Sequence, residues 1–156
     1  MERKISIEEQ LGRDGYLVST TVGYSMWPML KNRRDRVIIR SYGEGEAPKQ
    51  NDLILYRRRD GKHVLHRALW VDESCCITRG DNTYYLEEVK HKQILGKVTE
   101  FYRKDRHHTV NSGFYKAYVW VWRILFPLRA LLHGLKIGFH KLLSLAKRAA
   151  KKILKK

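Results

Sequence analysis

Cysteine is nearly absent from this sequence of 156 residues: Cys75 and Cys76 are its only two, and they are adjacent. Adjacent cysteines cannot form an ordinary structural disulfide, and two cysteines provide neither a disulfide framework nor the usual spacing of zinc ligands. Proline is also rare, with three residues, which excludes collagen-like and proline-rich low-complexity chains. This composition permits a reducing compartment.

Long uncharged apolar runs are missing as well, because none reaches the roughly 18 residues that a simple membrane span needs. The segment Met1 to Gln10 carries charges throughout and lacks the apolar stretch of a secretory signal peptide. We therefore expect no signal peptide, and we expect any contact with a membrane to come from the other end of the chain.

Acidic residues are absent from residues 114–156, which contain eleven Lys or Arg. Residues 1–113 hold 21 basic and 16 acidic side chains, although the whole chain has a formal net charge of +16. A cationic segment of this kind suits lipid headgroups, nucleic acid or an acidic protein. Since 43% of all residues are hydrophobic, we expect one folded domain followed by a cationic tail.

The first 105 residues are predicted to be mainly β, because four or five short segments rich in strand formers alternate with turn residues. A short helix or entry segment precedes them, within Ile5 to Val22. The predicted strands lie at Tyr16–Thr21, Arg36–Tyr42, on both sides of Asp60-Gly61, at Cys75–Thr78 and at Ile94–Tyr102.

The clearest local signal is a hairpin, formed by LILYRRR, Asp60-Gly61 and KHVLHRALW. A two-residue Asp-Gly loop favours a tight turn between paired strands, and counting outward from it places Leu55 opposite His66. Val64 and Ala68 lie on the same face as His66. Because burial disfavours a charged imidazole, we expect His66 to be neutral.

A charged linker is predicted at residues 106–113, before an aromatic and Lys-rich tail at 114–156. Pro127 should kink or divide any helix there. From Leu131 onward, apolar and cationic residues recur at spacings of three and four, which predicts an amphipathic helix. The apolar positions are Leu131, Leu135, Phe139, Leu142, Leu143, Ala146, Ala149, Ala150, Ile153 and Leu154. The opposite positions are Lys136, His140, Lys147, Lys151 and Lys155.

The aromatic residues of the tail, among them Trp120 and Trp122, suit a bilayer interface, whereas Arg123 and Arg129 are costly at its centre. We therefore expect residues 114–156 to lie on an anionic membrane surface rather than to cross it. The alternative is that the aromatic part packs on the β domain and the lysines are merely solvated.

The segment GYSMWPML, from Gly23 to Leu30, places a small nucleophile after a flexible residue and before apolar anchors. A lone serine is usually a turn residue, but here Ser25 is followed along the chain by His66 and by Asp81 in a Gly-Asp-Asn turn. A neutral imidazole can take the proton of an attacking serine hydroxyl, and a carboxylate can orient the imidazole. Ser25, His66 and Asp81 are therefore candidate catalytic residues, and this chemistry needs no cofactor.

These motifs, in this order and spacing, resemble the type I signal peptidases and their relatives, the self-cleaving SOS-type repressors. The resemblance covers roughly residues 20 to 100. Bacterial members generally pair Ser with Lys, whereas the endoplasmic reticulum and archaeal branch has His before Arg, as here. The similar segments are Ser25-Met26-Trp27-Pro28-Met29-Leu30 for the nucleophile box, Asp35–Ile39 and Leu53–Tyr56 for the next strands, His66-Arg67 for the base and Gly80-Asp81-Asn82 for the late box.

The resemblance implies a mainly β fold, with a signal-peptidase-like coiled sheet or partial barrel over residues 1–105 and the amphipathic helical tail behind it. It implies a serine endopeptidase that cleaves a leader or signal-like segment from a precursor with small residues before the cut. Ser25 would be the nucleophile, His66 the general base and Asp81 the third member. Gly23, Met26 and Pro28 would bind the substrate or the oxyanion.

Two features depart from the family pattern. Many members have a serine where this chain has Gly23, so backbone N–H groups around Ser25 would have to hold the oxyanion. The family's membrane anchor usually precedes the nucleophile box, whereas this chain offers a C-terminal candidate. We expect a membrane-associated protein, with the side of the membrane and the oligomeric state open.

Several alternatives remain at this point. His66 could be a core histidine bonded to backbone, Asp81 could only brace its loop, and Lys62 could be the base of a Ser-Lys site. The chain could also be a regulatory protein with a self-cleaving or inactive repressor-type core, or a noncatalytic membrane-surface protein. Nucleic acid is the less favoured partner, because only about twenty residues precede Ser25, too few for a DNA-binding module.

Overall fold

The computed structural model describes residues 5–153 and is mainly antiparallel β-sheet with three α-helices. The chain divides into two compact units, which meet between Val119 and Trp120 and are described separately. In chain order the elements are α1 (Ile7–Asp14), β1 (Tyr16–Thr20), β2 (Arg36–Arg40), β3 (Leu53–Arg57), β4 (His63–Val71), β5 (Cys75–Arg79), β6 (Glu87–Lys90), a 3-10 turn (His91–Gln93), β7 (Ile94–Arg103), β8 (Arg106–Thr109), α2 (Gly113–Ile124) and α3 (Phe126–Ile153).

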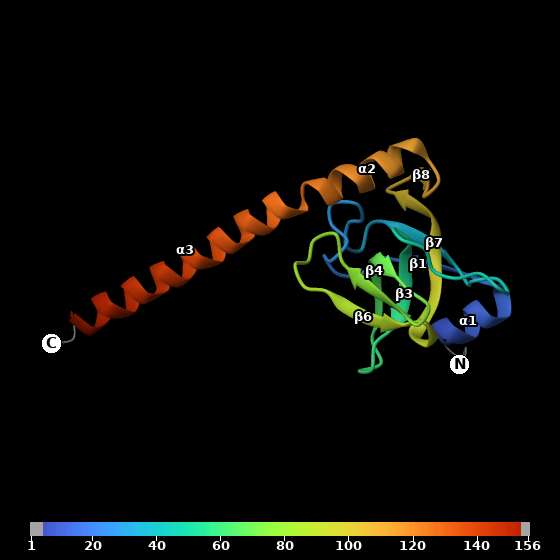
Figure 1. Ribbon diagram of the computed structural model, residues 1–156, viewed down its shortest axis with the longest axis horizontal. Coiled ribbons are helices and arrows are strands. Elements are labelled where there is room, and N and C mark those ends of the chain that lie inside the picture. The colour runs from blue at the N-terminus through green and yellow to red at the C-terminus, as the bar shows by residue number, and fades with distance from the viewer. Residues whose placement is uncertain (1–4, 154–156) are drawn as a thin grey trace. The chain divides into compact units, whose positions relative to one another are not determined.

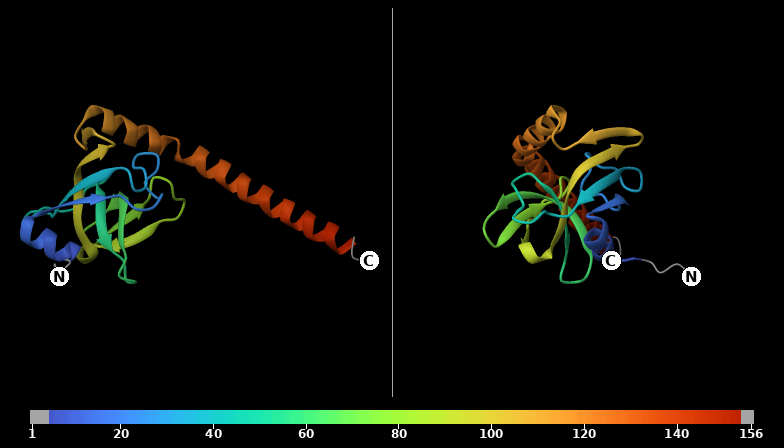
Figure 2. Two further views of the ribbon diagram at one scale, coloured as in Figure 1. Left: turned by 180° about the vertical axis from the view of Figure 1, so that it is seen from behind. Right: turned by 90° about the vertical axis from the view of Figure 1, so that its right-hand side faces the viewer.

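The first unit contains one sheet in the order β1-β2-β7-β3-β4-β5-β6, with β8 paired to β7. All of its pairings are antiparallel. The strands wrap around a shared interior rather than lying flat (Figures 1 and 2). β1 and β6 are the two ends of the strand order, so each has an outer edge that no strand of the sheet covers.

The core of this unit lies between the curved strands. β3 is buried along Leu53 to Tyr56, as expected for a central strand, and β2 alternates between buried and exposed side chains. Full burial of an aliphatic side chain stabilises a fold by roughly 1.5–3 kcal/mol. The core residues from the neighbouring segments are Leu11, Leu17, Met26, Met29, Leu30, Val37, Ile39, Val98 and Phe101.

The β3–β4 hairpin is present, but its predicted register is wrong by one residue. Ile54 lies opposite His66, whereas Leu55 lies opposite Leu65. The cause is the loop: the Arg58 carbonyl accepts a hydrogen bond from the Gly61 N–H at 3.0 Å. Gly61 has a φ of +81°, so the connection is a three-residue turn with a left-handed last residue rather than a two-residue turn.

The predicted linker at residues 106–113 is wrong in its first half. Arg106–Thr109 forms β8, and His108 stacks on Phe101 of β7 with ring centroids 5.1 Å apart. Tyr115 and Val119 of α2 are buried in the core, so the first unit extends to Val119 rather than ending at residue 105. The charged residues of this segment lie in the turn and at the adjoining strand ends, with Arg103 ending β7 and Arg106 beginning β8, which made the segment resemble a linker.

The second unit, from Trp120, contains the end of α2 and the helix α3. α2 ends at Ile124 and α3 begins at Phe126, so the prediction that Pro127 divides the helical segment is confirmed. Proline fits the first turn of a helix, where its missing N–H has no partner to lose. Leu154 and Lys155 of the predicted helix lie outside the described residues. Between residues 5 and 153, no helix combines the length and apolar character required to span a membrane.

Candidate active site

Ser25 lies in the turn that follows β1, and the Gly80-Asp81-Asn82 loop binds this turn directly. The Asn82 N–H donates to the Ser25 carbonyl at 2.7 Å, and the Asn82 side-chain amide donates to the Tyr24 carbonyl at 3.2 Å. The loop is attached to the end of β5, which pairs with the strand that carries His66. Two motifs separated by more than fifty residues in the sequence therefore share one site.

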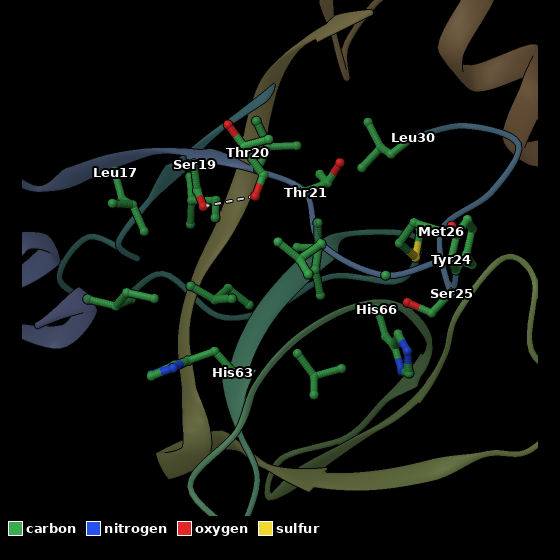
Figure 3. Close-up of a pocket in the computed structure, with 18 of the residues that line it drawn as sticks. Leu17, Ser19, Thr20, Thr21, Tyr24, Ser25, Met26, Leu30, His63 and His66 are labelled. Atoms are coloured by element: carbon green, nitrogen blue, oxygen red, sulfur yellow. Dashed lines mark hydrogen bonds between the residues drawn. The ribbon is translucent and has the colours of Figure 1, made fainter. Parts of the chain in front are cut away.

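Gly80 brings Ser25 and His66 close together. A Cβ on this residue would stand 2.6 Å from the Ser25 carbonyl oxygen, 2.9 Å from the Ser25 Cβ and 3.0 Å from the His66 Nε2. No side chain fits there, so only glycine permits this packing. Figure 3 shows the Ser25 hydroxyl pointing toward the His66 ring. The structure therefore brings Ser25 and His66 together.

The other nitrogen of His66 faces a tyrosine and a glutamate. The His66 Nδ1 lies 3.2 Å from the Tyr56 hydroxyl and 3.7 Å from Glu87 Oε1. The Tyr56 hydroxyl donates its proton to Glu87 Oε2 at 2.8 Å, so its oxygen can only accept from the His66 Nδ1–H. This network protonates Nδ1 and leaves Nε2 with a free electron pair on the side of Ser25.

Burial keeps the imidazole neutral, as the sequence predicted. His66 is 1% exposed, and this burial lowers its pKa from 6.5 to about 4, against the opposing effect of Glu87. Burial alone would raise the pKa of Glu87, but hydrogen bonds from Arg58 and Tyr56 hold it below its ordinary value. The site thus combines a neutral imidazole with a carboxylate anion on its far side.

Asp81 is not placed as the sequence analysis expected. Its two carboxylate oxygens accept from Nε and Nη2 of Arg67 at 2.9 and 2.8 Å, and Tyr118 also donates to it at 3.0 Å. Arg67 follows His66 on β4, and adjacent strand residues face opposite sides of a sheet. Asp81 therefore pairs with Arg67, and the position at His66 Nδ1 is occupied by Tyr56 and Glu87. The hydrogen bonds of Asp81 agree with the alternative in which this residue only braces its loop.

Tyr56 and Glu87 were missed by the sequence analysis. Glu87 begins β6, whose sequence EEVK has two acidic residues and gave no strand signal. Tyr56 pairs with Val64, which places it diagonally beside His66 on the neighbouring strand. The correct hairpin register would have identified Tyr56, whereas Glu87 required the pairing of β6 with β5.

The remaining candidate residues lie on the Ser25 loop. The Gly23 N–H donates to the Asn32 side-chain oxygen at 2.9 Å, so it holds the loop rather than an oxyanion. Met26 is buried in the core and lines a cavity beside Ser25. The Pro28 carbonyl accepts a hydrogen bond of 3.4 Å from Arg103, which ties this end of the loop to β7.

Lys62 is excluded as the base by its position. It lies in the turn between β3 and β4, its side chain is 75% exposed, and its ammonium group pairs with Asp60 at 3.3 Å.

A cavity of about 390 Å³ extends from Ser25 and His66 and is called the groove below (Figure 3). Residues of β1 and of the segment that joins it to Ser25 form one side, and β4 from His66 to His63 forms another. The apolar lining residues are Ile7, Leu17, Val22, Met26, Leu30, Val37, Ile39, Leu55, Val64 and Leu65. Ser25 and His66 therefore lie at a largely apolar depression of the surface.

Comparison with known proteins gives no relative for this chain: no family model and no curated sequence matches it.

Proposed function

We propose that this protein is a serine endopeptidase related to the signal peptidases, with Ser25 as its nucleophile and His66 as its general base. One observation carries the proposal: the Ser25 hydroxyl points toward the ring of a buried imidazole whose Nε2 lies on the Ser25 side, at the mouth of an apolar groove. The curved antiparallel sheet is compatible with the coiled sheet of that family, and we include this fold in the proposal.

The chemistry follows from the two nitrogens of His66. As the Ser25 oxygen attacks a peptide carbonyl, its proton passes to Nε2, and the resulting imidazolium is stabilised by Glu87 beside Nδ1. The C–N bond then breaks and Nε2 returns the proton to the leaving amine, which leaves an acyl group on Ser25. A water molecule, deprotonated by Nε2, hydrolyses this ester and restores the free hydroxyl.

The oxyanion requires a donor, and the Ser25 N–H is the best candidate. It makes no hydrogen bond within the part of the chain that the structure describes, whereas the Gly23 N–H is bound to Asn32. Loss of one oxyanion donor typically costs a hundredfold to a thousandfold in rate. Because Gly23 replaces the hydroxyl donor of many signal peptidases, we expect slower turnover than in those enzymes.

The outer edge of β1 is suited to an extended peptide. Thr21 bonds toward β2 with both backbone groups, donating to the Asp35 carbonyl at 3.0 Å and accepting from the Arg33 N–H at 2.7 Å. Because backbone groups alternate in direction along a strand, those of Thr20 and Val22 face the opposite side. Both residues also line the groove. A substrate could therefore add as a strand to β1, with its scissile carbonyl near Ser25.

The pH dependence of cleavage tests the base. With the pKa of His66 at about 4, kcat/KM should rise with pH up to about 5 and then stay level toward neutrality. Protonation of His66 would also favour the unfolded chain, whose histidine has a pKa near 6.5, so stability should fall as the pH drops from 6.5 toward 4. A pH–rate profile on a cleaved peptide is the measurement. An acidic limb near pH 6.5 would contradict a buried base.

The second unit supports a membrane location. Leu128, Leu135 and Leu142 of α3 share one helix face and are exposed, whereas Lys136 and Lys147 lie to one side of it. A helix with an apolar face and a lysine-rich remainder lies in the interface of an anionic bilayer. Arg129 stacks over the Trp122 ring at 3.6 Å, which covers part of its charged group with an aromatic surface. We propose that this unit binds anionic membrane surfaces.

Substitution on the two faces of α3 tests this location. Leu135→Glu should weaken binding to vesicles of phosphatidylglycerol and phosphatidylcholine by at least tenfold, because it places a charge in the apolar face. Ile137→Glu is the matched control: Ile137 is also exposed, but it lies on the lysine-bearing side. Vesicle sedimentation at two salt concentrations measures both. Equal losses for the two variants, or tighter binding to duplex DNA than to vesicles, would contradict a lipid-facing surface.

A further inference from the structure

The groove is larger than small substrate residues require. Its volume is about 390 Å³, whereas an apolar cavity of about 150 Å³ is enough to bind benzene. Apart from His66, the most deeply buried lining residues are aliphatic: Leu30, Val37 and Ile39 keep 1–2% of their surface exposed. Such a lining favours the binding of an apolar side chain that is large enough to fill the groove, because an alanine would leave most of the space empty.

The position of the groove relates this space to the cleavage site. Along β4 the lining extends from His66 to His63, which at about 3.3 Å per residue is a distance of roughly 10 Å. A peptide paired with β1 would direct every second side chain toward the interior of the site. A residue within about four positions of the scissile bond would therefore have its side chain in the groove.

We propose that the enzyme selects substrates with a large apolar residue, such as leucine or phenylalanine, at one position within four residues of the scissile bond. This inference rests on the proposed function and specifies its substrate. It differs from the small residues that the family resemblance led us to expect before the cut. A hydrophobic pocket distinguishes side chains that differ by a few methylene groups by roughly tenfold to a few hundredfold.

Ser19 offers a way to fill the groove without disturbing its floor. Its side chain lies on the groove wall, and its hydroxyl donates to the Thr20 carbonyl at 3.4 Å (Figure 3). Val18, the preceding residue of β1, is 50% exposed and lies on the opposite face. Ser19→Phe should occupy the groove with an aromatic ring, whereas Val18→Phe adds the same ring outside it and serves as the matched control.

The test uses peptides that differ only in one residue, alanine, leucine or phenylalanine, placed in turn at each of the four positions on either side of the bond. In the wild-type protein, kcat/KM should be at least tenfold higher for leucine or phenylalanine than for alanine at one position. Ser19→Phe should abolish this preference, and Val18→Phe should retain it. Equal rates for the three residues at every position, or equal effects of the two variants, would overturn the inference.

A binding measurement distinguishes failure of this inference from failure of the proposed catalysis. Fluorescence anisotropy with the same peptides and the Ser25→Ala variant should give at least tenfold tighter binding of the large apolar residue. A second substitution, Ser19→Phe, should remove that difference. If this preference holds but the wild-type protein cleaves no peptide, the groove's specificity stands and the proposed function falls. If peptides are cleaved but bind to Ser25→Ala with no preference, the inference falls and the proposed function stands.

Discussion

Replacement of Ser25 by alanine is expected to lower the rate of peptide cleavage by at least about a thousandfold, because it removes the atom that attacks the carbonyl. His66→Ala should cause a loss of similar size, since it removes the imidazole that lies beside the Ser25 hydroxyl. The double variant should lose little more than either single variant, because the two residues act in one step. Mass spectrometry of the peptide products measures all three rates.

Two substitutions outside the pair control for indirect effects. Lys62→Ala removes the exposed lysine of the hairpin turn, and Ser74→Ala removes an exposed serine from the turn between β4 and β5. Both should cleave at the wild-type rate. Thermal unfolding should show that Ser25→Ala remains folded, since Ser25 is only half-buried. Equal cleavage by Ser25→Ala, His66→Ala and the wild type would remove the proposed mechanism.

Replacement of Asp81 by leucine is expected to lower the free energy of unfolding by about 3–5 kcal/mol, because it leaves the guanidinium of Arg67 buried without a counter-charge. The Asp81 and Arg67 side chains are each 3% exposed, so neither can reach water without local unfolding. Adding Arg67→Met removes the buried, unpaired charge and should restore at least about 2 kcal/mol of the free energy of unfolding. Urea unfolding of the single and double variants completes this cycle.

The double variant Asp81→Leu, Arg67→Met also tests the role of Asp81. If Asp81 supports the loop only through Arg67, the folded double variant should cleave within about tenfold of the wild-type rate. Glu87→Gln should instead lower the rate by roughly a hundredfold or more, because it removes the anion that stabilises the His66 imidazolium. A double variant that is stable but inactive, together with an active Glu87→Gln variant, would return the third catalytic role to Asp81.

The pairing of Ser25 with His66 was predictable because each residue carries a local signal. Ser25 lies in an unusual apolar turn, and His66 alternates with Val64 and Ala68 on a strand, which already predicts burial and a neutral ring. The partner of His66 was not predictable in this way. The identity of this partner depends on whether a carboxylate reaches His66 Nδ1 from the Asp81 loop or from β6. The order of motifs along the chain does not distinguish these two geometries.

The missed strands have a common physical cause. β6 and β8 contain Glu88, Arg106 and His107, whose charged or polar groups remain at the surface while the backbone pairs with a neighbouring strand. Tertiary pairing thus outweighs low strand propensity. A single extra loop residue similarly shifted the β3–β4 register, because a turn sets the pairing of every residue beyond it.

The helix α3, unlike β6 and β8, was predicted from the sequence. A periodic pattern from Leu131 onward, longer than twenty residues, predicted a helix there, and Pro127 predicted a kink or division of the helical segment, because both signals are local. The aromatic residues of α2 allowed two interpretations, because aromatic side chains are common both in a protein core and at a membrane interface. Tyr115 and Val119 are buried in the β unit, whereas Trp120 is 66% exposed, so we propose membrane contact for the second unit and not for these two residues.

Trapping of an acyl group tests the central claim most directly. The purified protein is mixed with a short peptidyl thioester, quenched in acid and analysed by intact mass and peptide mapping. Attack by the Ser25 oxygen would expel the thiol and leave one acyl group on that residue, and His66→Gln should slow this step at least about a hundredfold. No adduct, an adduct on another residue, or equal labelling of His66→Gln would contradict an activated Ser25.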